Sequence, residues 1–193
     1  MIKIFFKRDV QIYMADWRYY FPSWLFFFLI LFTLQMTDLN QGAEFFLLFF
    51  VLVLTFKDTF AADQKLGLID MLVVEKKSLT PYVFSKILSG MVFILSPLLL
   101  TICFVAGHFN FVLPGLLITI LAVMGASMQM SKNVSWMLHL ILLPFMVPIF
   151  LVLTMHHLDR IDCLTMNSVF SGMFLIYLPL SIVFGTLCLK LGD

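Results

Sequence analysis

Six long apolar segments dominate this chain and constrain its fold more than any other feature. They cover roughly residues 23–37, 43–56, 82–106, 111–128, 134–155 and 168–189. A helix needs about 20 residues to cross the hydrocarbon core of a bilayer. The third, fifth and sixth segments meet that length, whereas the second is short and needs flanking residues to cross. We therefore expect an all-α polytopic membrane protein with six transmembrane helices in a single domain, residues 1–193.

The composition supports a membrane environment. Apolar residues make up 62% of the 193 residues and charged residues 12%, and the mean hydropathy is +1.06. Soluble domains carry about a quarter charged residues, and a soluble domain of this length could not hide so much apolar surface. The net charge of +1 gives no indication of nucleic-acid binding.

The distribution of basic residues predicts the orientation of the spans. Cytoplasmic loops of membrane proteins collect Lys and Arg. If the N-terminus is cytoplasmic, only Arg160 of the 12 basic residues falls outside. The residues then on the cytoplasmic side are Lys3, Lys7, Arg8, Arg18, Lys57, Lys65, Lys76, Lys77, Lys86, Lys132 and Lys190. We predict six spans with both termini cytoplasmic, because a five-span arrangement with a re-entrant second segment would scatter these charges over both faces.

The first 21 residues have the pattern of an interfacial amphipathic helix. Apolar residues recur every three or four positions, at Ile2, Phe6, Val10, Tyr13, Trp17 and Phe21. Basic residues occupy other positions, as in helices that lie in the headgroup plane. The alternative is a merely basic juxtamembrane tail. A cleaved signal peptide is not expected, because charged residues interrupt this stretch and it lacks a compact apolar core.

A polar stretch, FAADQKLGLIDMLVVEKK at residues 60–77, separates the second and third apolar segments. Its charged residues are Asp63, Lys65, Asp70, Glu75, Lys76 and Lys77. One helix face can gather Phe56, Phe60, Leu66, Ile69, Met71 and Val73, while Asp58, Asp63, Lys65 and Asp70 stay in water. Gly67 permits a close approach or a helix break. Such an amphipathic segment suits docking into a groove of a soluble partner; the alternative is a helix that rests on the membrane surface.

Motifs for chemistry are absent, and prolines interrupt the apolar segments. Pro97, Pro144 and Pro148 remove backbone donors and should kink their helices. The sequence lacks G-x-x-x-x-G-K-[ST], so we expect no ATP binding by this chain, and it also lacks G-x-S-x-G and H-E-x-x-H. We predict a non-catalytic membrane subunit that holds no cofactor and receives its energy from a partner.

A cluster of histidines lies in the predicted outer loop TMHHLDRID. His156 and His157, near Asp159 and Asp162, could reach a metal or a haem iron. Short polar loops often contain such clusters by accident. We interpret these histidines as non-essential and predict no metal site, with haem or metal ligation by His156 and His157 as the alternative.

The spacing within the polar stretch resembles a known family. The pattern F-x-x-D-x-x-x-G-x-[IL]-[DE], formed by Phe60, Asp63, Gly67, Ile69 and Asp70, is similar to the loop of the cytochrome c maturation protein B family, also called haem exporter protein B. The resemblance continues in register through Lys86 and Pro97. It returns at ILLPFMVPIF, where Pro144 and Pro148 match the paired prolines of the family, and so covers most of the chain.

The resemblance implies a six-helix, ABC-2-type permease-like component of an ABC-type complex. Such complexes work in the bacterial inner membrane or, in some lineages, the mitochondrial inner membrane. A separate ATPase of the ABC type binds ATP and attaches to the cytoplasmic loop, and a haem-handling membrane subunit sits alongside. The complex serves cytochrome c biogenesis through haem export, or through loading and release of a haem chaperone, with haem as the expected substrate.

Roles for the loop residues follow from the resemblance. Residues 57–81 would be the cytoplasmic coupling loop. Phe60 and Ile69 would be apolar anchors for the ATPase, Asp63 and Asp70 its charged contacts, and Gly67 the point of closest approach. Two alternatives stay open: an ABC-2-type exporter subunit for another substrate, such as a lipid, polysaccharide or drug, or a non-transporting scaffold that holds the ATPase and the haem-handling subunit together.

Overall fold

The chain is helical throughout the part that the structure describes. The computed structural model describes residues 2–15, 17–36, 41–56, 59–75, 78–106, 111–129 and 137–191. Within these ranges every regular element is a helix and none is a strand. The prediction of an all-α fold is therefore confirmed.

The helices follow one another with short connections. In chain order they are α1 (Ile2–Ala15), α2 (Trp17–Met36), α3 (Gln41–Phe56), α4 (Thr59–Lys65), α5 (Leu68–Val74), α6 (Thr80–Gly90), the π-helix η1 (Met91–Leu95), α7 (Ser96–Ala106), α8 (Val112–Gln129), α9 (Met137–His157) and α10 (Cys163–Leu191). The last turn of α6 continues into η1 and α7, so these three elements form one long helical segment.

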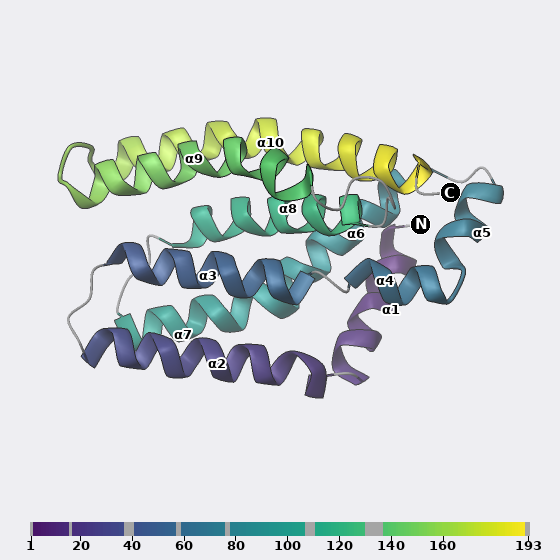
Figure 1. The fold of residues 1–193 in the computed structure, drawn as a ribbon, viewed down its shortest axis with the longest axis horizontal. Helices are drawn as coiled ribbons and strands as arrows, with labels where there is room; N and C mark the ends of the chain where they lie inside the picture. Colours follow the sequence, from purple (N-terminus) through teal and green to yellow (C-terminus); the bar gives the residue numbers. More distant parts are fainter. Residues whose placement is uncertain are drawn as a thin grey trace.

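The long helices form a bundle whose two ends differ (Figure 1). Helices α2, α3, α7, α8, α9 and α10 run along the long axis, whereas α1 crosses that axis at one end. The α4–α5 pair and the last turns of α10 lie at this same end, and the turn between α9 and α10 lies at the opposite end. The structure thus gathers α1, α4, α5 and the end of α10 on one side of the bundle.

Helix α8 forms the centre of the bundle. It packs against α3, α6, α9 and α10, while α2 packs against α3 and α7. In the most apolar 18-residue stretch of α8, 78% of residues are buried, compared with 22% in α10. An apolar helix that is buried all round belongs in a core, whereas one that exposes most of its apolar surface needs a lipid or protein neighbour.

Among the residues that the structure describes, three continuous helical segments are long and apolar enough to cross a membrane. They are Thr80–Val105, Val112–Gln129 and Cys163–Lys190. A fourth is reached if Ile2–Ala15 and Tyr20–Leu34, whose axes differ by 70°, count as one broken span. The apolar helices Leu47–Phe56 and Pro144–His157 are shorter. The prediction of a polytopic membrane protein is therefore supported with three to four spans, and six are not confirmed.

The N-terminal helix is shorter than the sequence predicts. Helix α1 ends at Ala15, and residues 17–21 already belong to α2. Asp9 and Tyr13 are buried in α1, which packs against α6, whereas Trp17 and Phe21 are exposed. One face of α1 therefore packs on α6. The position of α1 at a membrane surface stays a prediction.

The predicted kink prolines lie within long helices. Pro97 occupies the second position of α7, directly after the π-helical turn Met91–Leu95. Because proline lacks an N–H, such a local change of hydrogen-bond register is one way to satisfy the freed carbonyls. Pro144 and Pro148 both lie inside the single helix α9. Whether these prolines bend their helices stays a prediction.

Candidate functional site

The polar stretch folds into two short helices joined by a tight turn. The N–H of Gly67 donates to the carbonyl of Gln64 at 2.9 Å, and Gly67 has φ 69° and ψ 13°. This left-handed conformation costs other residues roughly 1–2 kcal/mol, so glycine is the residue that suits the turn. A Cβ at this position would meet nothing within 4 Å. Gly67 therefore serves the turn itself, and we call α4, Gly67 and α5 the α4–α5 hairpin.

The hairpin buries one face and exposes the other, in part with the residues predicted. Phe60 and Ile69 are buried and Lys65 and Asp70 are exposed, as predicted, and Asp58 lies outside the described residues. Phe60, Ile69 and Leu72 are buried, and the ring centroid of Phe60 lies 5.9 Å from that of Tyr82 in an edge-to-face arrangement. Among the side chains that the structure describes here, the exposed ones are Lys65, Leu66, Asp70, Met71, Val74 and Glu75. The prediction that Leu66 and Met71 share the apolar face with Phe60 and Ile69 is therefore wrong.

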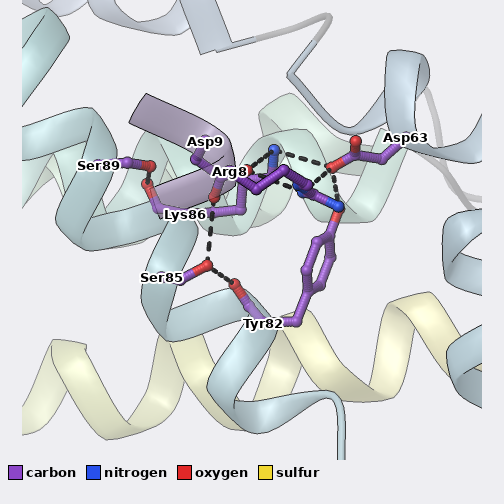
Figure 2. Close-up of polar contacts among 7 residues, drawn as sticks. All are labelled: Arg8, Asp9, Asp63, Tyr82, Ser85, Lys86 and Ser89. Atoms are coloured by element: carbon purple, nitrogen blue, oxygen red, sulfur yellow. Dashed lines mark hydrogen bonds and ion pairs between the residues drawn. The ribbon is translucent and has the colours of Figure 1, made fainter. Parts of the chain in front are cut away.

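Asp63 points inward, away from the exposed face of the hairpin. Its exposed fraction is 2%, so the prediction that it stays in water is wrong. Three donors converge on its Oδ2 atom: Nζ of Lys86 at 2.8 Å, Nη2 of Arg8 at 2.9 Å and the Tyr82 hydroxyl at 2.7 Å. Figure 2 shows these groups meeting around one carboxylate. As placed here, Asp63 contacts its own chain.

A second carboxylate completes the arrangement. Asp9, which is 1% exposed, accepts from Arg8 at 2.8 Å and pairs with Lys86 Nζ at 3.1 Å through Oδ1. The Ser85 hydroxyl lies 3.2 Å from Oδ2 of Asp9 and 2.9 Å from the carbonyl oxygen of Tyr82, so its single hydrogen is shared between them (Figure 2). We call Arg8, Asp9, Asp63, Tyr82, Ser85 and Lys86 the ion cluster.

The ion cluster is neutral and connects three segments. Two cations pair with two carboxylates. Helix α1 supplies Arg8 and Asp9, α4 supplies Asp63 and α6 supplies Lys86. Buried charges are tolerated only when they are paired and hydrogen-bonded, and removal of one partner costs about 3–5 kcal/mol. The cluster therefore fixes the position of α4 relative to both α1 and α6.

The electrostatic balance keeps Asp63 ionised. Burial would by itself raise the pKa of Asp63, but Lys86, the Tyr82 hydroxyl and Arg8 outweigh it and hold the pKa below its usual value. Both carboxylates of the cluster are engaged by cations. Chemically, this arrangement suits a permanent link between helices better than it suits a general base.

The sequence contained a signal for the cluster that our prediction did not use. Lys86 lies inside a long apolar segment, and an ionisable residue at such a place requires a named partner. Asp9 lies seven residues after Ile2 and four before Tyr13, hence on the apolar face of α1. Lys86 and Asp9 are thus charges of opposite sign within apolar patterns, and together they could have indicated the contact between α1 and α6.

The remaining predicted site residues are not brought together. Gly67 and Asp70 lie on the hairpin, whereas Pro97, Pro144 and Pro148 lie within α7 and α9. The docking roles given to Phe60, Asp63, Gly67, Ile69 and Asp70 stay predictions. The inward placement of Phe60, Asp63 and Ile69 leaves Asp70 as the predicted charged contact that reaches the surface.

The histidines lie at the opposite end of the bundle from the cluster. His156 Nδ1 is 3.0 Å from the carbonyl oxygen of Ile161, and His157 is exposed in the same turn. Within the residues that the structure describes, no group of three His, Cys, Asp or Glu side chains is placed to hold a metal. The carbonyl oxygen of Ile161 thus already contacts the imidazole of His156.

Comparison with known proteins gave no match. No family model, no curated protein and no solved structure matches this chain.

Proposed function

We propose that this chain is the membrane-embedded permease subunit of an ATP-driven ABC-type complex, and that a separate ATPase attaches to the α4–α5 hairpin. One observation carries the proposal. The hairpin lies at the end of the bundle with an exposed face of apolar and charged residues, while its inner face is bound through Asp63 to α1 and α6. On this proposal, the surface for a soluble partner is joined through Asp63 to α1 and to the start of the segment Thr80–Val105.

The link gives a route from the partner to the bundle. A force on the hairpin would reach Lys86, near the start of the segment Thr80–Val105, through the Asp63 carboxylate. It would reach α1 through Arg8. Since the buried pairs resist separation by several kcal/mol, we expect the hairpin, α1 and the start of α6 to move as one unit.

We also propose six spans with both termini cytoplasmic. Helices α2 and α9 have 20 and 21 residues, which meets the length that crosses a bilayer, and α3 supplies a shorter sixth span. The distribution of Lys and Arg supports this orientation. The α4–α5 hairpin, α1 and the last turns of α10 lie at the same end of the bundle (Figure 1), as an even number of spans requires.

The proposed process is cytochrome c biogenesis. The support for it is the spacing of Phe60, Asp63, Gly67, Ile69 and Asp70 and the paired prolines, which resemble the cytochrome c maturation protein B family. On this proposal the complex contains an ABC ATPase and a haem-handling membrane subunit, and it exports haem or releases a haem chaperone. It resides in the bacterial inner membrane or the mitochondrial inner membrane.

Purification of the chain from its native membrane tests the proposal. We expect an ATPase and a haem-binding membrane protein to accompany it. In a strain that lacks the chain, we expect holo-cytochrome c to be lost while its apoprotein is still made. Normal haem attachment in that strain would instead indicate an exporter subunit for another substrate. Full maturation with an ATPase that binds but cannot hydrolyse ATP would indicate a non-transporting scaffold.

A further inference from the structure

A cavity of about 440 Å³ lies between α1 and α2, and one of its walls is Tyr13, one helical turn from Asp9 of the ion cluster. Its walls come from α1, α2, α3, η1 and α7, and its aromatic lining consists of Tyr13, Trp17, Tyr20, Phe21, Trp24 and Phe93. Small-molecule sites in proteins span roughly 300–1,000 Å³. The cavity is therefore large enough for a ligand rather than a few water molecules.

The walls offer a ligand little hydrogen bonding. Trp24 Nε1 lies 3.1 Å from the Thr101 hydroxyl and 3.4 Å from the carbonyl oxygen of Pro97, so its single N–H is already engaged by α7. The Thr55 hydroxyl donates to the carbonyl of Val51 at 2.7 Å. Tyr13 and Phe93 stack with their ring centroids 5.8 Å apart. Among the described residues the Tyr13 hydroxyl finds no hydrogen-bond partner, but most of the lining is aromatic or aliphatic. Since burial of unpaired polar groups is costly, this lining favours a mainly hydrocarbon occupant.

The outer face of α1 carries positive charge next to the cavity. Lys3, Lys7 and Gln11 are spaced four residues apart and exposed, and they line a shallow groove. Met14, three residues after Gln11, continues this row and is also a wall of the cavity. The acidic residue Asp9 of the same helix faces away from this row, since it is buried in the ion cluster. Two lysines thus lie on the same exposed row of α1 that ends, at Met14, in the wall of the apolar cavity.

We propose that the cavity holds one acyl chain of an anionic phospholipid whose phosphate lies against Lys3 and Lys7. The 70° angle between α1 and α2 suits this occupant, because a helix crossing the bundle end can lie at headgroup depth while α2 descends into the hydrocarbon. Apolar walls take the chain and the lysines take the headgroup. The proposal rests on membrane embedding and is independent of any ATPase.

The site would also connect lipid to the proposed coupling unit. Tyr13 lines the cavity and lies one helical turn after Asp9, which belongs to the ion cluster. A chain seated against Tyr13 therefore supports the helix that supplies Arg8 and Asp9. Anionic lipid is thereby expected to stabilise the packing of α1 on α6.

Trp24 fluorescence tests the proposal in the full-length chain. Trp17→Phe, which keeps an aromatic ring in that wall of the cavity, and Trp136→Phe leave Trp24 as the sole tryptophan, since the chain has 3. The protein is reconstituted in phosphatidylcholine vesicles that contain the same small fraction of either dibrominated phosphatidylglycerol or dibrominated phosphatidylcholine. Bromine quenches only nearby indoles, so we expect preferential quenching by the phosphatidylglycerol. Equal quenching by the two lipids would overturn the proposal.

Two sets of variants separate the headgroup from the chain. Lys3→Gln and Lys7→Gln should each lower the preference for phosphatidylglycerol about fivefold, the equivalent of about 1 kcal/mol per cation near an anionic surface. Lys65→Gln, an exposed cation of α4, is the matched control and should leave it unchanged. Ser23→Leu and Ser23→Phe place extra atoms in the cavity wall and should abolish the preference. A preference that survives either the paired lysine substitutions or the filling of the cavity contradicts the proposal.

Discussion

Lys86 and Asp63 form a buried ion pair between the start of a long apolar segment and the α4–α5 hairpin, with Nζ and Oδ2 2.8 Å apart. The exposed fractions of the two residues are 4% and 2%. The pair joins the α4–α5 hairpin to the segment Thr80–Val105, which is long and apolar enough to cross a membrane. The stability of this junction and its use by a partner can be tested separately.

Asp63→Asn should destabilise the protein strongly. The substitution keeps the shape of the side chain but leaves Lys86 and Arg8 facing Asp9 alone. Loss of one member of a buried pair costs about 3–5 kcal/mol, measurable as a lower free energy of unfolding of the purified protein in detergent. Asp70→Asn, exposed on the same hairpin, should change that free energy by less than about 0.5 kcal/mol. Similar decreases in unfolding free energy for Asp63→Asn and Asp70→Asn would contradict the view that Asp63 is a buried link and Asp70 a surface residue.

Lys86→Met combined with Asp63→Asn should be less damaging than the sum of the single substitutions. Each single variant leaves a net charge buried in the cluster, whereas the double variant retains the neutral pair of Arg8 and Asp9. We expect an interaction free energy of about 1–3 kcal/mol in the double-mutant cycle of unfolding. Simple additivity of the two effects would argue that Lys86 and Asp63 do not interact.

The contribution of Asp63 should depend on pH in a defined direction. The folded state lowers the pKa of Asp63, so the carboxylate stabilises the fold above its unfolded pKa of about 3.9. That stabilisation is lost as the pH falls through the lower folded value. The difference in unfolding free energy between wild type and Asp63→Asn should stay constant from about pH 8 to pH 5 and narrow only below about pH 4. Narrowing already near pH 6 would contradict the lowered pKa.

Gly67→Ala should weaken the hairpin because of its backbone conformation alone. A Cβ at Gly67 meets nothing within 4 Å, yet φ is +69°, so the expected cost is roughly 1–2 kcal/mol. Gly172→Ala is the matched control, since its Cβ also meets nothing within 4 Å and its φ is not positive. Faster proteolytic cleavage within the hairpin of Gly67→Ala, but not of Gly172→Ala, is the expected result. Equal cleavage of the two variants would argue against strain at Gly67.

Gly90→Ala should be destabilising through overcrowding against α3. A Cβ there would lie 2.6 Å from Cε1 of Phe56, a fully buried ring, and such overpacking costs typically about 1–3 kcal/mol. Phe56→Leu removes the outer ring atoms and should rescue part of the loss in the double variant. If the destabilisations of the two single variants simply add in the thermal unfolding of the double variant, the contact between position 90 and Phe56 is not the cause of the loss.

The sequence was sufficient for some levels of this structure and insufficient for others. Apolar segments and turn chemistry are local, so the helical class and the break at Gly67 could be predicted. The inward turn of Asp63 could not be predicted from helix periodicity, because Arg8 is 55 residues away along the chain and only the tertiary fold brings them together. The end of α1 at Ala15 was not predicted either, because the apolar pattern of the first 21 residues continues through Trp17 and Phe21 without a break.

Lys86 illustrates what sequence reasoning could have added. A lysine in an apolar segment needs an acidic partner, and the segments on that side of the predicted membrane supply several carboxylates, Asp9 and Asp63 among them. The orientation argument assigns Lys86 only to the cytoplasmic side and leaves its need for an acidic partner unaddressed. The exposed residues Met71 and Val74, by contrast, carry apolar side chains that helix periodicity alone could not assign to a surface.

The central claim is that the exposed face of α5 receives an ATPase while the ion cluster holds the hairpin in place. The most direct measurement is the amount of ATPase that co-purifies with full-length wild type and with the Asp70→Asn, Met71→Arg double variant from native membranes. Asp159→Asn, Leu158→Arg, exposed at the opposite end of the bundle, is the matched control. The account predicts loss of the ATPase from the α5 variant alone, with the unfolding free energy of the purified chain unchanged. Wild-type amounts of ATPase on the α5 variant would contradict it.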